Sequence, residues 1–512
     1  MHAHEQLVAT LLRELPDAQL VETHISSVIL SRDLVYKLKK PVDFGFLDYS
    51  TLAKRHHCAL EELRSNRRGA PQLYLGLVTI TGSVDVPVIE GEGEVIDYAV
   101  KMRRFEERDQ LDHVIDAGRM GIEAMDDLAA MIAAFHQNAA PVASETEFGE
   151  PEVLLHPMIE NFDYFDLLLD DDGVSATLAD LKVWTLNTFE HLKPLLQSRK
   201  AAGYIRECHG DMHLHNMAYY HGELILFDAI EFNPNLSHID VISDLAFLLM
   251  DLEYRGLYGF SRRLLNAYLE ITGDYGSVTL LRFYKLYRAM VRAKVEALRA
   301  AQHPGGEAYD AILAGVKRYI GLARSYTQGG TPFLAITHGY SGSGKSSAAL
   351  MAVEAHGAVR IRSDVERMRL FRTPCAGAGY SGVGGGIYTP EATRRTYDRL
   401  LELAATVVKG GTPVVVDATF LKRWQRTLFE SLAESLGVAY VIFEMACDEA
   451  VLYERVERRR QEGRDVSEAD RSVLQRQIET GELLEAGELA YAHTIDCTTM
   501  EGMKESVLGV RA

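Results

Sequence analysis

The chain has 512 residues, of which 47% are hydrophobic, and it carries 73 acidic against 54 basic side chains, a net charge of -19. At roughly 100 to 200 residues per domain, this length predicts about three folding units. The negative charge argues against bulk electrostatic binding of nucleic acid or of an anionic membrane. The five cysteines are scattered without a CxxC pair, which argues against a disulfide framework and a zinc ribbon, so we expect a protein of the reducing cytoplasm.

The first 327 residues change from strand patterns to helical patterns. Residues 1–19 break their apolar positions with charge and lack a basic n-region, so they predict an amphipathic helix rather than a signal peptide. Residues 27–44 and 73–91 alternate like strands, whereas residues 111–324 are dominated by helical periodicity. No apolar run reaches the ~20 residues of a membrane-spanning helix, so we expect a soluble protein. We predict a bilobed α+β domain over residues 1–327, with an N-lobe at about 1–105 and a helical C-lobe at about 106–327.

A lysine pair stands in the strand-like stretch LVYKLKK, residues 34–40. Alternation places Lys37 and Lys39 on one face of that strand. The helical stretch CALEELRSNRR then offers Glu61 or Glu62 as the acid that would hold a phosphate-binding lysine in place. We prefer Lys37 with Glu62, although a solvated strand edge and an ordinary exposed helix residue remain alternatives.

The stretch HGDMHLHN, His209 to Asn216, allows three interpretations: a structural polar turn, a metal site built from its three histidines, or a phosphotransferase loop. Phosphoryl transfer needs a carboxylate beside the acceptor hydroxyl, a magnesium ligand nearby, and a second acid on the next strand. Asp211 and Asn216 have the D-x-x-x-x-N spacing of a kinase catalytic loop, and ELILFDAIEFN delivers Asp228 at the end of an apolar strand. A zinc site at His209, His213 and His215 would explain neither Lys37 nor Asp228.

With HGDMHLHN and FDAIEFN in this order, residues 20 to 325 resemble the aminoglycoside phosphotransferase and choline kinase group, a branch of the protein-kinase-like fold. The resemblance implies Asp211 as the base for an acceptor hydroxyl, Asn216 and Asp228 as magnesium ligands, and Lys37 as a contact to the nucleotide phosphates. Acidic residues after Asp228 shape the substrate side in this group, and Asp240 and Asp244 have either that role or a purely structural one. The chain departs from kinases in having ETHISSVILSRD where a G-x-G-x-x-G loop would stand.

A Gly-Gly-Thr-Pro breaker predicts a domain boundary near Gly329. Short apolar strands alternate with helical stretches after it, which predicts an α/β P-loop domain with a mostly parallel sheet over residues 331–512. GYSGSGKS fits G-x-x-x-x-G-K-[ST] between a strand and a helix, so its backbone N–H groups and its lysine can converge on phosphates, with Ser346 as a magnesium ligand. A flexible Gly/Ser turn with a surface lysine is the alternative. The predicted nucleotide-binding residues are Gly339, Ser341, Gly342, Ser343, Gly344, Lys345, Ser346 and Ser347.

Further site candidates follow the P-loop. Asp364 and Arg367 stand one helical turn apart in IRSDVERMRLF, and Asp417 ends the strand PVVVDATF, where a Walker B acid and metal ligand would lie. Arg455 and Arg459 lie four apart on one helical face, as lid arginines would; a solvated basic face is the alternative.

The S-D-x-x-R pattern resembles the small-kinase branch of P-loop proteins, which includes polynucleotide kinases, chloramphenicol phosphotransferase and zeta toxins, from Pro332 to about Thr498. The resemblance implies Asp364 as an acceptor base and Arg367 as a contact to a substrate phosphate, although a helix cap with a solvated arginine is the alternative. Arg455 would then contact the nucleotide, and Arg459 would clamp the transferring phosphate. The glycine-rich residues 377–388 look like a mobile substrate loop.

The sequence thus predicts a bifunctional phosphotransferase that uses ATP and Mg²⁺ in two domains, each moving a γ-phosphoryl group to a hydroxyl acceptor of unknown identity. We expect no membrane partner, and a nucleic-acid end remains among the possible acceptors. Two alternatives stay open. The N-terminal domain could be a pseudokinase that regulates the P-loop domain, or the chain could be a nucleotide-switched binding protein.

Overall fold

The structure is a computed structural model that describes residues 2–44, 47–168, 172–302, 305–371, 389–462 and 471–510. By packing, the chain forms two compact units, and each is described by itself. The first unit comprises Met1–Ala124, Met131–Arg255 and Phe283–Arg324. The second comprises Met125–Ala130, Gly256–Arg282 and Ser325–Ala512. Gly256–Arg282 therefore packs with residues far downstream of it, and the boundary near Gly329 stays a prediction.

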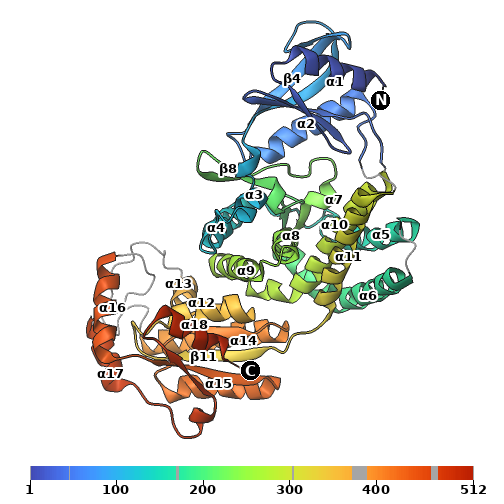
Figure 1. Cartoon of the computed structure of the whole chain (residues 1–512). Coiled ribbons are helices and arrows are strands. Elements are labelled where there is room, and N and C mark those ends of the chain that lie inside the picture. The colour runs from blue at the N-terminus through green and yellow to red at the C-terminus, as the bar shows by residue number, and fades with distance from the viewer. Residues whose placement is uncertain are drawn as a thin grey trace. The chain divides into compact units, whose positions relative to one another are not determined.

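An antiparallel sheet of six strands, in the order β1-β2-β3-β6-β4-β5, forms the N-lobe of the first unit (Figure 1). Alternating residues of the central strands face opposite sides: Ile29 and Leu38 pack with Leu11 of the first helix, whereas Val35 and Val100 pack with Ala59 of the second. The N-terminal residues form the predicted amphipathic helix. The elements are α1 (His2–Glu14), β1 (Gln19–Glu22), β2 (Ser26–Ser31), β3 (Leu34–Lys39), α2 (Leu52–Asn66), β4 (Tyr74–Ser83), β5 (Val86–Ile89) and β6 (Val95–Arg103).

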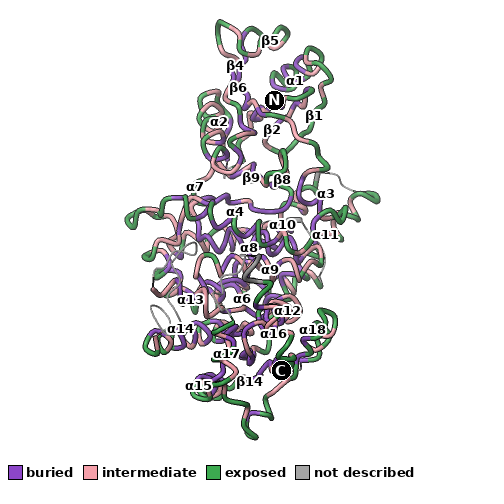
Figure 2. The backbone as a smooth tube through the Cα atoms, turned by 90° about the vertical axis from the view of Figure 1, so that its left-hand side faces the viewer, coloured by how far each residue is buried: buried purple, intermediate pink, exposed green. Residues whose placement is uncertain are grey.

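The rest of the first unit is mainly helical. Its central helix, α8 (Val241–Tyr254), is buried along nearly its whole length (Figure 2). Two short antiparallel pairs, β7 with β10 and β8 with β9, adjoin HGDMHLHN, which follows β7 and precedes β8 in the chain. The other elements are η1 (Glu107–Asp109), α3 (Leu111–Asp116), α4 (Ala124–Asn138), α5 (Pro151–Leu168), α6 (Asp172–Ala201), β7 (Ile205–Glu207), η2 (Leu214–Asn216), β8 (Met217–Tyr220), β9 (Glu223–Leu226), α7 (Pro234–Ser237), β10 (His238–Asp240), α10 (Leu281–Gln302) and α11 (Glu307–Thr327).

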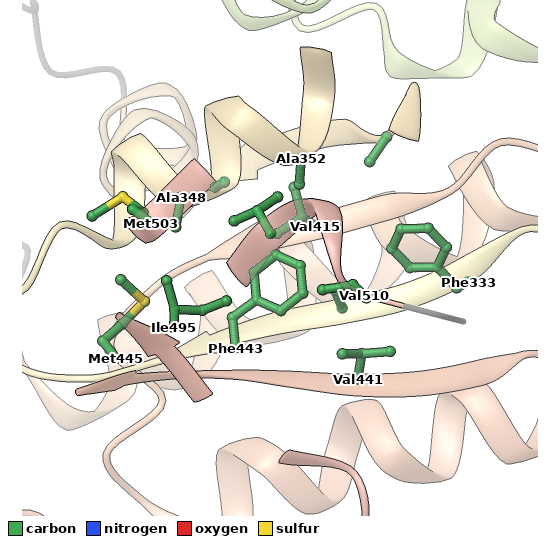
Figure 3. Packing of buried hydrophobic residues seen from close by; sticks show 14 of the residues in the cluster. Phe333, Ala348, Ala352, Val415, Val441, Phe443, Met445, Ile495, Met503 and Val510 are labelled. Carbon is green, nitrogen blue, oxygen red and sulfur yellow. The ribbon is translucent and has the colours of Figure 1, made fainter. Parts of the chain in front are cut away.

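A parallel sheet of five strands, in the order β12-β13-β11-β14-β15, is the core of the second unit. Figure 3 shows Ala348 and Ala352 directed at the strand residues Val415, Phe443 and Ile495, and these small side chains let their helix lie close to the sheet. The elements are α9 (Tyr258–Thr272), η3 (Tyr275–Leu280), β11 (Phe333–His338), α12 (Lys345–His356), β12 (Val359–Arg362), α13 (Ser363–Leu370), α14 (Pro390–Lys409), β13 (Val414–Asp417), α15 (Arg423–Leu436), β14 (Ala439–Ala446), α16 (Glu449–Glu462), α17 (Arg471–Thr480), η5 (Glu488–Ala490), β15 (Ala492–Asp496) and α18 (Met500–Leu508).

The predicted fold classes are confirmed: the first unit combines an antiparallel sheet lobe with a helical lobe, and the second unit has a parallel sheet covered by helices. Within the described ranges, no helix combines the length and the apolar character needed to cross a membrane.

Candidate functional site

The stretch HGDMHLHN forms a loop whose backbone is fixed by an acid of α8. The backbone N–H groups of His209 and Gly210 donate to the two carboxylate oxygens of Asp244, at 2.8 and 2.9 Å. Gly210 has φ 84°, and a Cβ there would lie 2.7 Å from the carbonyl oxygen of Leu236, so this position requires glycine. Asp244 is fully buried and also contacts His136, which identifies it as a support of the loop.

Asp211 and Asn216 face each other across this loop. The Asn216 side-chain amide donates to Asp211 Oδ2 at 3.0 Å, and His213 Nε2 lies 3.2 Å from the same oxygen. Burial raises the pKa of Asp211, but His213 and Arg292 outweigh burial, so the pKa lies well below its ordinary value. The carboxylate is therefore ionised at neutral pH and able to accept a hydrogen bond from a hydroxyl group.

Asp228 lies at the end of the next strand pair and meets Lys37. The Lys37 ammonium contacts Asp228 Oδ1 and lies 2.8 Å from Glu62 Oε1. Asp228 has φ 63°, an uncommon conformation for a residue with a side chain, and its N–H donates to the Tyr74 hydroxyl at 3.2 Å. The structure thus brings together the predicted Lys37, Glu62 and Asp228.

Lys39, the lysine that was not preferred from the sequence, shares the same acid. Its ammonium lies 2.8 Å from Glu62 Oε2 and 3.2 Å from the Tyr49 hydroxyl, and it also contacts Glu231. Tyr49 in turn donates to Glu231 at 2.6 Å. Burial raises the pKa of Glu62, but the two lysines outweigh burial and lower it to about 2. Sequence reasoning missed Glu231, although the residue stands inside the quoted FDAIEFN.

The three histidines of the loop do not converge. His209 Nε2 lies 2.9 Å from the carbonyl oxygen of Phe227, whereas His215 Nδ1 lies 3.3 Å from Asp112. Burial lowers the pKa of His209, which favours the neutral ring. The geometry fits a hydrogen-bonding role for His209 and gives no shared zinc position with His213 and His215.

Two buried acids after Asp228 have structural partners. Asp240 forms a two-pronged ion pair with Arg199, at 2.6 and 2.8 Å, and caps α8 through the N–H of Ile242. Among the described residues, His136, Cys208 and Asp244 form one group whose potential metal-ligand atoms lie close together. Because Asp244 already accepts the loop N–H groups there, this group is explained as packing around the loop.

The predicted phosphate loop connects β11 to α12. Gly342 and Gly344 have φ 85° and 90°, and a Cβ at Gly342 would lie 2.9 Å from the carbonyl oxygen of Leu452. The Lys345 ammonium donates to the Tyr340 carbonyl at 2.6 Å, so the lysine side chain folds back onto the loop. Ser341 N–H donates to the side-chain oxygen of Gln477, on α17, at 2.9 Å. Sequence reasoning missed Gln477, because only tertiary packing brings α17 to this loop.

The remaining P-loop positions place polar groups at one edge of the sheet. Ser346 and Ser347 lie in the first turn of α12, and Asp417 ends β13, the neighbour of β11. Because parallel strands end at the same edge, Asp417 lies beside the start of the loop, where Gly339 N–H donates to Thr419 O at 3.2 Å. Among the described residues, the buried Ser343 Oγ and Asp417 Oδ2 have no hydrogen-bond partner.

Asp364 and Arg367 both lie on α13, directly after β12, and Arg367 is buried. Arg455, on α16, donates to the carbonyls of Cys497 at 2.8 Å and Gly342 at 3.5 Å, so it packs against the phosphate loop. Arg459 lies on the same helix, but its side chain is outside the described residues, as is the glycine-rich segment 377–388.

The residues present fit a magnesium nucleotide in each unit. In the second unit, the glycine backbone, Lys345 and the Ser343 and Asp417 oxygens, which have no hydrogen-bond partner among the described residues, form a buried polar surface at a helix N-terminus. Such a surface suits phosphate and a divalent cation. In the first unit, Lys37 would bind phosphate, and Asn216 and Asp228 supply the oxygens that magnesium prefers.

Residues 334–484 match the AAA domain family. An uncharacterized protein of Mycobacterium tuberculosis is 30% identical over 436 residues, covering 85% of each chain. The chain belongs to the same family as this mycobacterial protein.

Solved structures resemble each region separately. A choline/ethanolamine kinase family protein of Mesorhizobium loti covers 63% of this chain and 99% of its own, with 13% identity and a TM-score of 0.37. A gluconokinase of Sinorhizobium meliloti covers 35% of this chain and 90% of its own, with 25% identity and a TM-score of 0.25. The C-terminal region is thus a P-loop domain of the AAA family by its sequence match, its loop and its sheet.

Proposed function

We propose that the chain is a bifunctional ATP-dependent phosphotransferase in which each unit transfers the γ-phosphoryl group of ATP to a hydroxyl acceptor. The observation that carries the proposal is the position of Lys37, whose ammonium touches both the buried Glu62 and Asp228. This arrangement keeps a phosphate-binding cation beside a candidate magnesium ligand. Mg²⁺, when bound, would neutralise charge on the phosphates.

The chain's own residues account for the transfer step in the first unit. Asp211, ionised and oriented by Asn216 and His213, accepts the proton of the acceptor hydroxyl. The acceptor oxygen forms a bond to the γ-phosphorus, and the bond from that phosphorus to the bridging oxygen breaks. ADP leaves with the electron pair of the broken bond. Asp244 keeps the loop in place throughout, through its two backbone hydrogen bonds.

The second unit supports the same reaction class with different parts. Lys345 and the loop N–H groups would hold the phosphates, and Asp364 is the candidate acceptor base. Arg367 and Arg455 supply positive charge near the developing negative charge, and Arg455 already rests on the loop backbone. The Asp417 Oδ2 atom has no hydrogen-bond partner within the described ranges, which supports a role beside the metal.

Isothermal titration calorimetry with MgATP tests whether there are two nucleotide sites. We expect about two sites per chain in the wild type and about one in either Lys345→Ala or Lys37→Met, because each substitution removes the phosphate-binding cation of one unit. Lys409→Ala is the control, because this lysine ends α14 and is no part of either proposed site. The same number of sites in Lys37→Met as in the wild type would contradict nucleotide binding by the first unit.

A further inference from the structure

Helix α10 lies against the HGDMHLHN loop of the first unit. Arg288, on this helix, donates from Nη1 to the Gly210 carbonyl oxygen at 3.0 Å and from Nε to the Ser243 carbonyl oxygen at 3.3 Å. The first of these hydrogen bonds fixes α10 at the residue that precedes Asp211. Arg292 follows four residues later, one helical turn along the same face. The helix therefore brings a second guanidinium toward the candidate catalytic base.

Arg292 interacts electrostatically with Asp211 and is positioned by a pair of stacked tyrosines. Burial lowers the pKa of Arg292, but Tyr319 and then Asp211 raise it, with a net increase, so the guanidinium stays charged. The guanidinium also donates a hydrogen bond to the hydroxyl of Tyr319, on α11, whose ring stacks on Tyr254 with 3.8 Å between the centroids. The Arg292 side chain is 27% exposed, so a ligand at the loop can reach it.

Helix α10 carries two arginines around one acid at this position. Glu296 Oε1 lies 3.9 Å from Arg292 Nη2, and Glu296 Oε2 lies 3.7 Å from Arg299 Nη1. Both distances are too long for hydrogen bonds, so one carboxylate only partly balances two positive charges. A guanidinium has five N–H donors in a rigid fork, more than the Tyr319 hydroxyl can occupy. Arg292 can therefore bind an additional carboxylate or phosphate group.

The acids that follow Asp228 in the chain are engaged in other contacts. Glu231 is paired with a lysine and accepts a hydrogen bond from a tyrosine. Asp240 is paired with an arginine, and Asp244 accepts the backbone N–H groups of the loop. These acids therefore stabilise the fold and the loop, whereas Arg292 is a partly exposed cation. This distribution of charge favours an anionic acceptor over a cationic one, because like charges repel each other.

We propose that the first unit phosphorylates a hydroxyl compound that already carries a phosphate or carboxylate group, and that Arg292 binds this anionic group beside Asp211. This inference rests on the proposed function of the first unit and names its acceptor class. The hydroxyl oxygen bonds to the γ-phosphorus, ADP leaves, and the hydroxyl proton passes to Asp211. The ionised Asp211 repels an anionic acceptor, and Arg292 offsets that repulsion. The phosphates of ATP have a cation of their own in Lys37, which lies beside Asp228.

The test uses the full chain carrying Lys345→Ala, so that phosphoryl transfer reports on the first unit. Ion exchange at pH 7 separates a cell extract into anionic, neutral and cationic small molecules and a macromolecular pool, and each is incubated with γ-labelled ATP. We expect the product that vanishes on addition of Asp211→Ala to arise from the anionic small molecules. Such a product confined to the other pools would overturn the proposal. If no pool gives a product that requires Asp211, the proposed function of the first unit fails instead.

Variants of Arg292 then test the role of this residue. Arg292→Gln should raise at least about tenfold the amount of anionic pool needed for half-maximal transfer, with KM for ATP changed less than about threefold, because it removes a contact to the acceptor alone. Arg292→Lys keeps the charge but loses the fork, so its effect should be smaller. A lower kcat in Arg292→Gln with an unchanged acceptor requirement would overturn the proposal, since the arginine would then act on the transferring phosphate.

Two control variants separate anion binding from packing. Arg299→Gln is the matched control, because Arg299 lies on the same helix and contacts the same Glu296, and it should leave the acceptor requirement unchanged. Tyr319→Phe removes the hydrogen bond to Arg292 but keeps the positive charge, so it should weaken acceptor binding less than Arg292→Gln. Equal losses in these last two variants would make Arg292 a structural partner of Tyr319 and overturn the proposal. Pretreatment of the anionic pool with immobilised alkaline phosphatase abolishes the product if the anionic group is a phosphate monoester and spares it if the group is a carboxylate.

Discussion

At the scale of single residues, the site depends on charges that are buried together. Glu62 is completely buried between Lys37 and Lys39, and each lysine also reaches an acid after β9, Asp228 or Glu231. Paired charges of this kind tolerate burial because each carries a partner and a hydrogen bond, whereas loss of one partner leaves the other uncompensated. The arrangement therefore fixes the positions of all five side chains rather than those of one lysine and one acid.

His338, at the end of β11, gives the second unit a dependence on pH. Burial and the nearby Arg426 and Lys345 lower the pKa of this imidazole to about 4, and Nε2 has no hydrogen-bond partner among the described residues. Because the folded pKa lies below the unfolded value of about 6.5, the neutral ring stabilises the fold fully above pH 6.5. That stability is lost as the pH falls through about 4.

We therefore expect the free energy of unfolding of the second unit to decrease when the pH is lowered from 7.5 to 4. This decrease should be up to about 3 kcal/mol larger in the wild type than in His338→Gln. The two tryptophans allow a direct measurement, because Trp184 lies in α6 and Trp424 lies in α15. Urea unfolding followed by fluorescence in a Trp184→Phe background reports on the second unit alone. Parallel pH profiles for the two proteins would show that His338 does not contribute.

At the scale of elements, α8 and α17 both act through contacts with a loop. Helix α8 supplies Asp244 to the HGDMHLHN loop, and α17 supplies Gln477 to the phosphate loop. The Gln477 side-chain oxygen accepts the N–H of Ser341, a donor of the kind that binds phosphate at a helix N-terminus. Helix α17 thus occupies part of the surface that a nucleotide phosphate would use.

Gln477→Ala should raise the affinity of the second unit for MgATP by roughly fivefold. In the wild type, the Ser341 N–H must give up its hydrogen bond to Gln477 before it can bind a phosphate oxygen, and a hydrogen bond is worth about 1 kcal/mol. Gln475→Ala is the control, since Gln475 lies on the same helix and its side-chain amide donates to the exposed Glu479 carboxylate at 3.0 Å. Calorimetry in a Lys37→Met background isolates the site. A lower affinity in Gln477→Ala would instead make Gln477 part of the nucleotide site.

The sequence predicted the elements whose signals are local. GYSGSGKS needs only a strand, glycines and a helix in order, and the structure has β11, positive φ at Gly342 and Gly344, and α12. The spacing of Asp211 and Asn216 within one loop likewise predicted their proximity. The roles of Asp240 and Asp244 could not be decided, because their partners Arg199 and His136 lie about forty and a hundred residues away.

At the scale of the whole molecule, the division of the chain follows packing rather than sequence order. Strands in the N-lobe were predicted from alternating apolar residues before the Gly-Gly-Thr-Pro breaker, and a mostly parallel sheet was predicted from short apolar stretches between helices after it. The structure has a six-stranded antiparallel sheet and a five-stranded parallel sheet in these places. The inclusion of α9 in the second unit was not predicted, because it depends on long-range ion pairs such as Glu270 with Arg362, which carry no local periodicity. The apolar face of an amphipathic helix indicates that the helix packs against another element, but it does not indicate which element.

The central claim is that the chain has two independent phosphoryl-transfer sites. Its most direct test is to incubate the protein with γ-labelled ATP and fractionated small molecules and macromolecules, and to compare the wild type with Asp211→Ala, Lys345→Ala and the double variant. We predict one labelled product that vanishes with Asp211→Ala but survives Lys345→Ala, and another with the reverse dependence. If no product depends on Asp211 while ATP turnover at the P-loop changes, the first unit regulates rather than transfers, and the claim is contradicted. Loss of the same products in both single variants would equally contradict two independent sites.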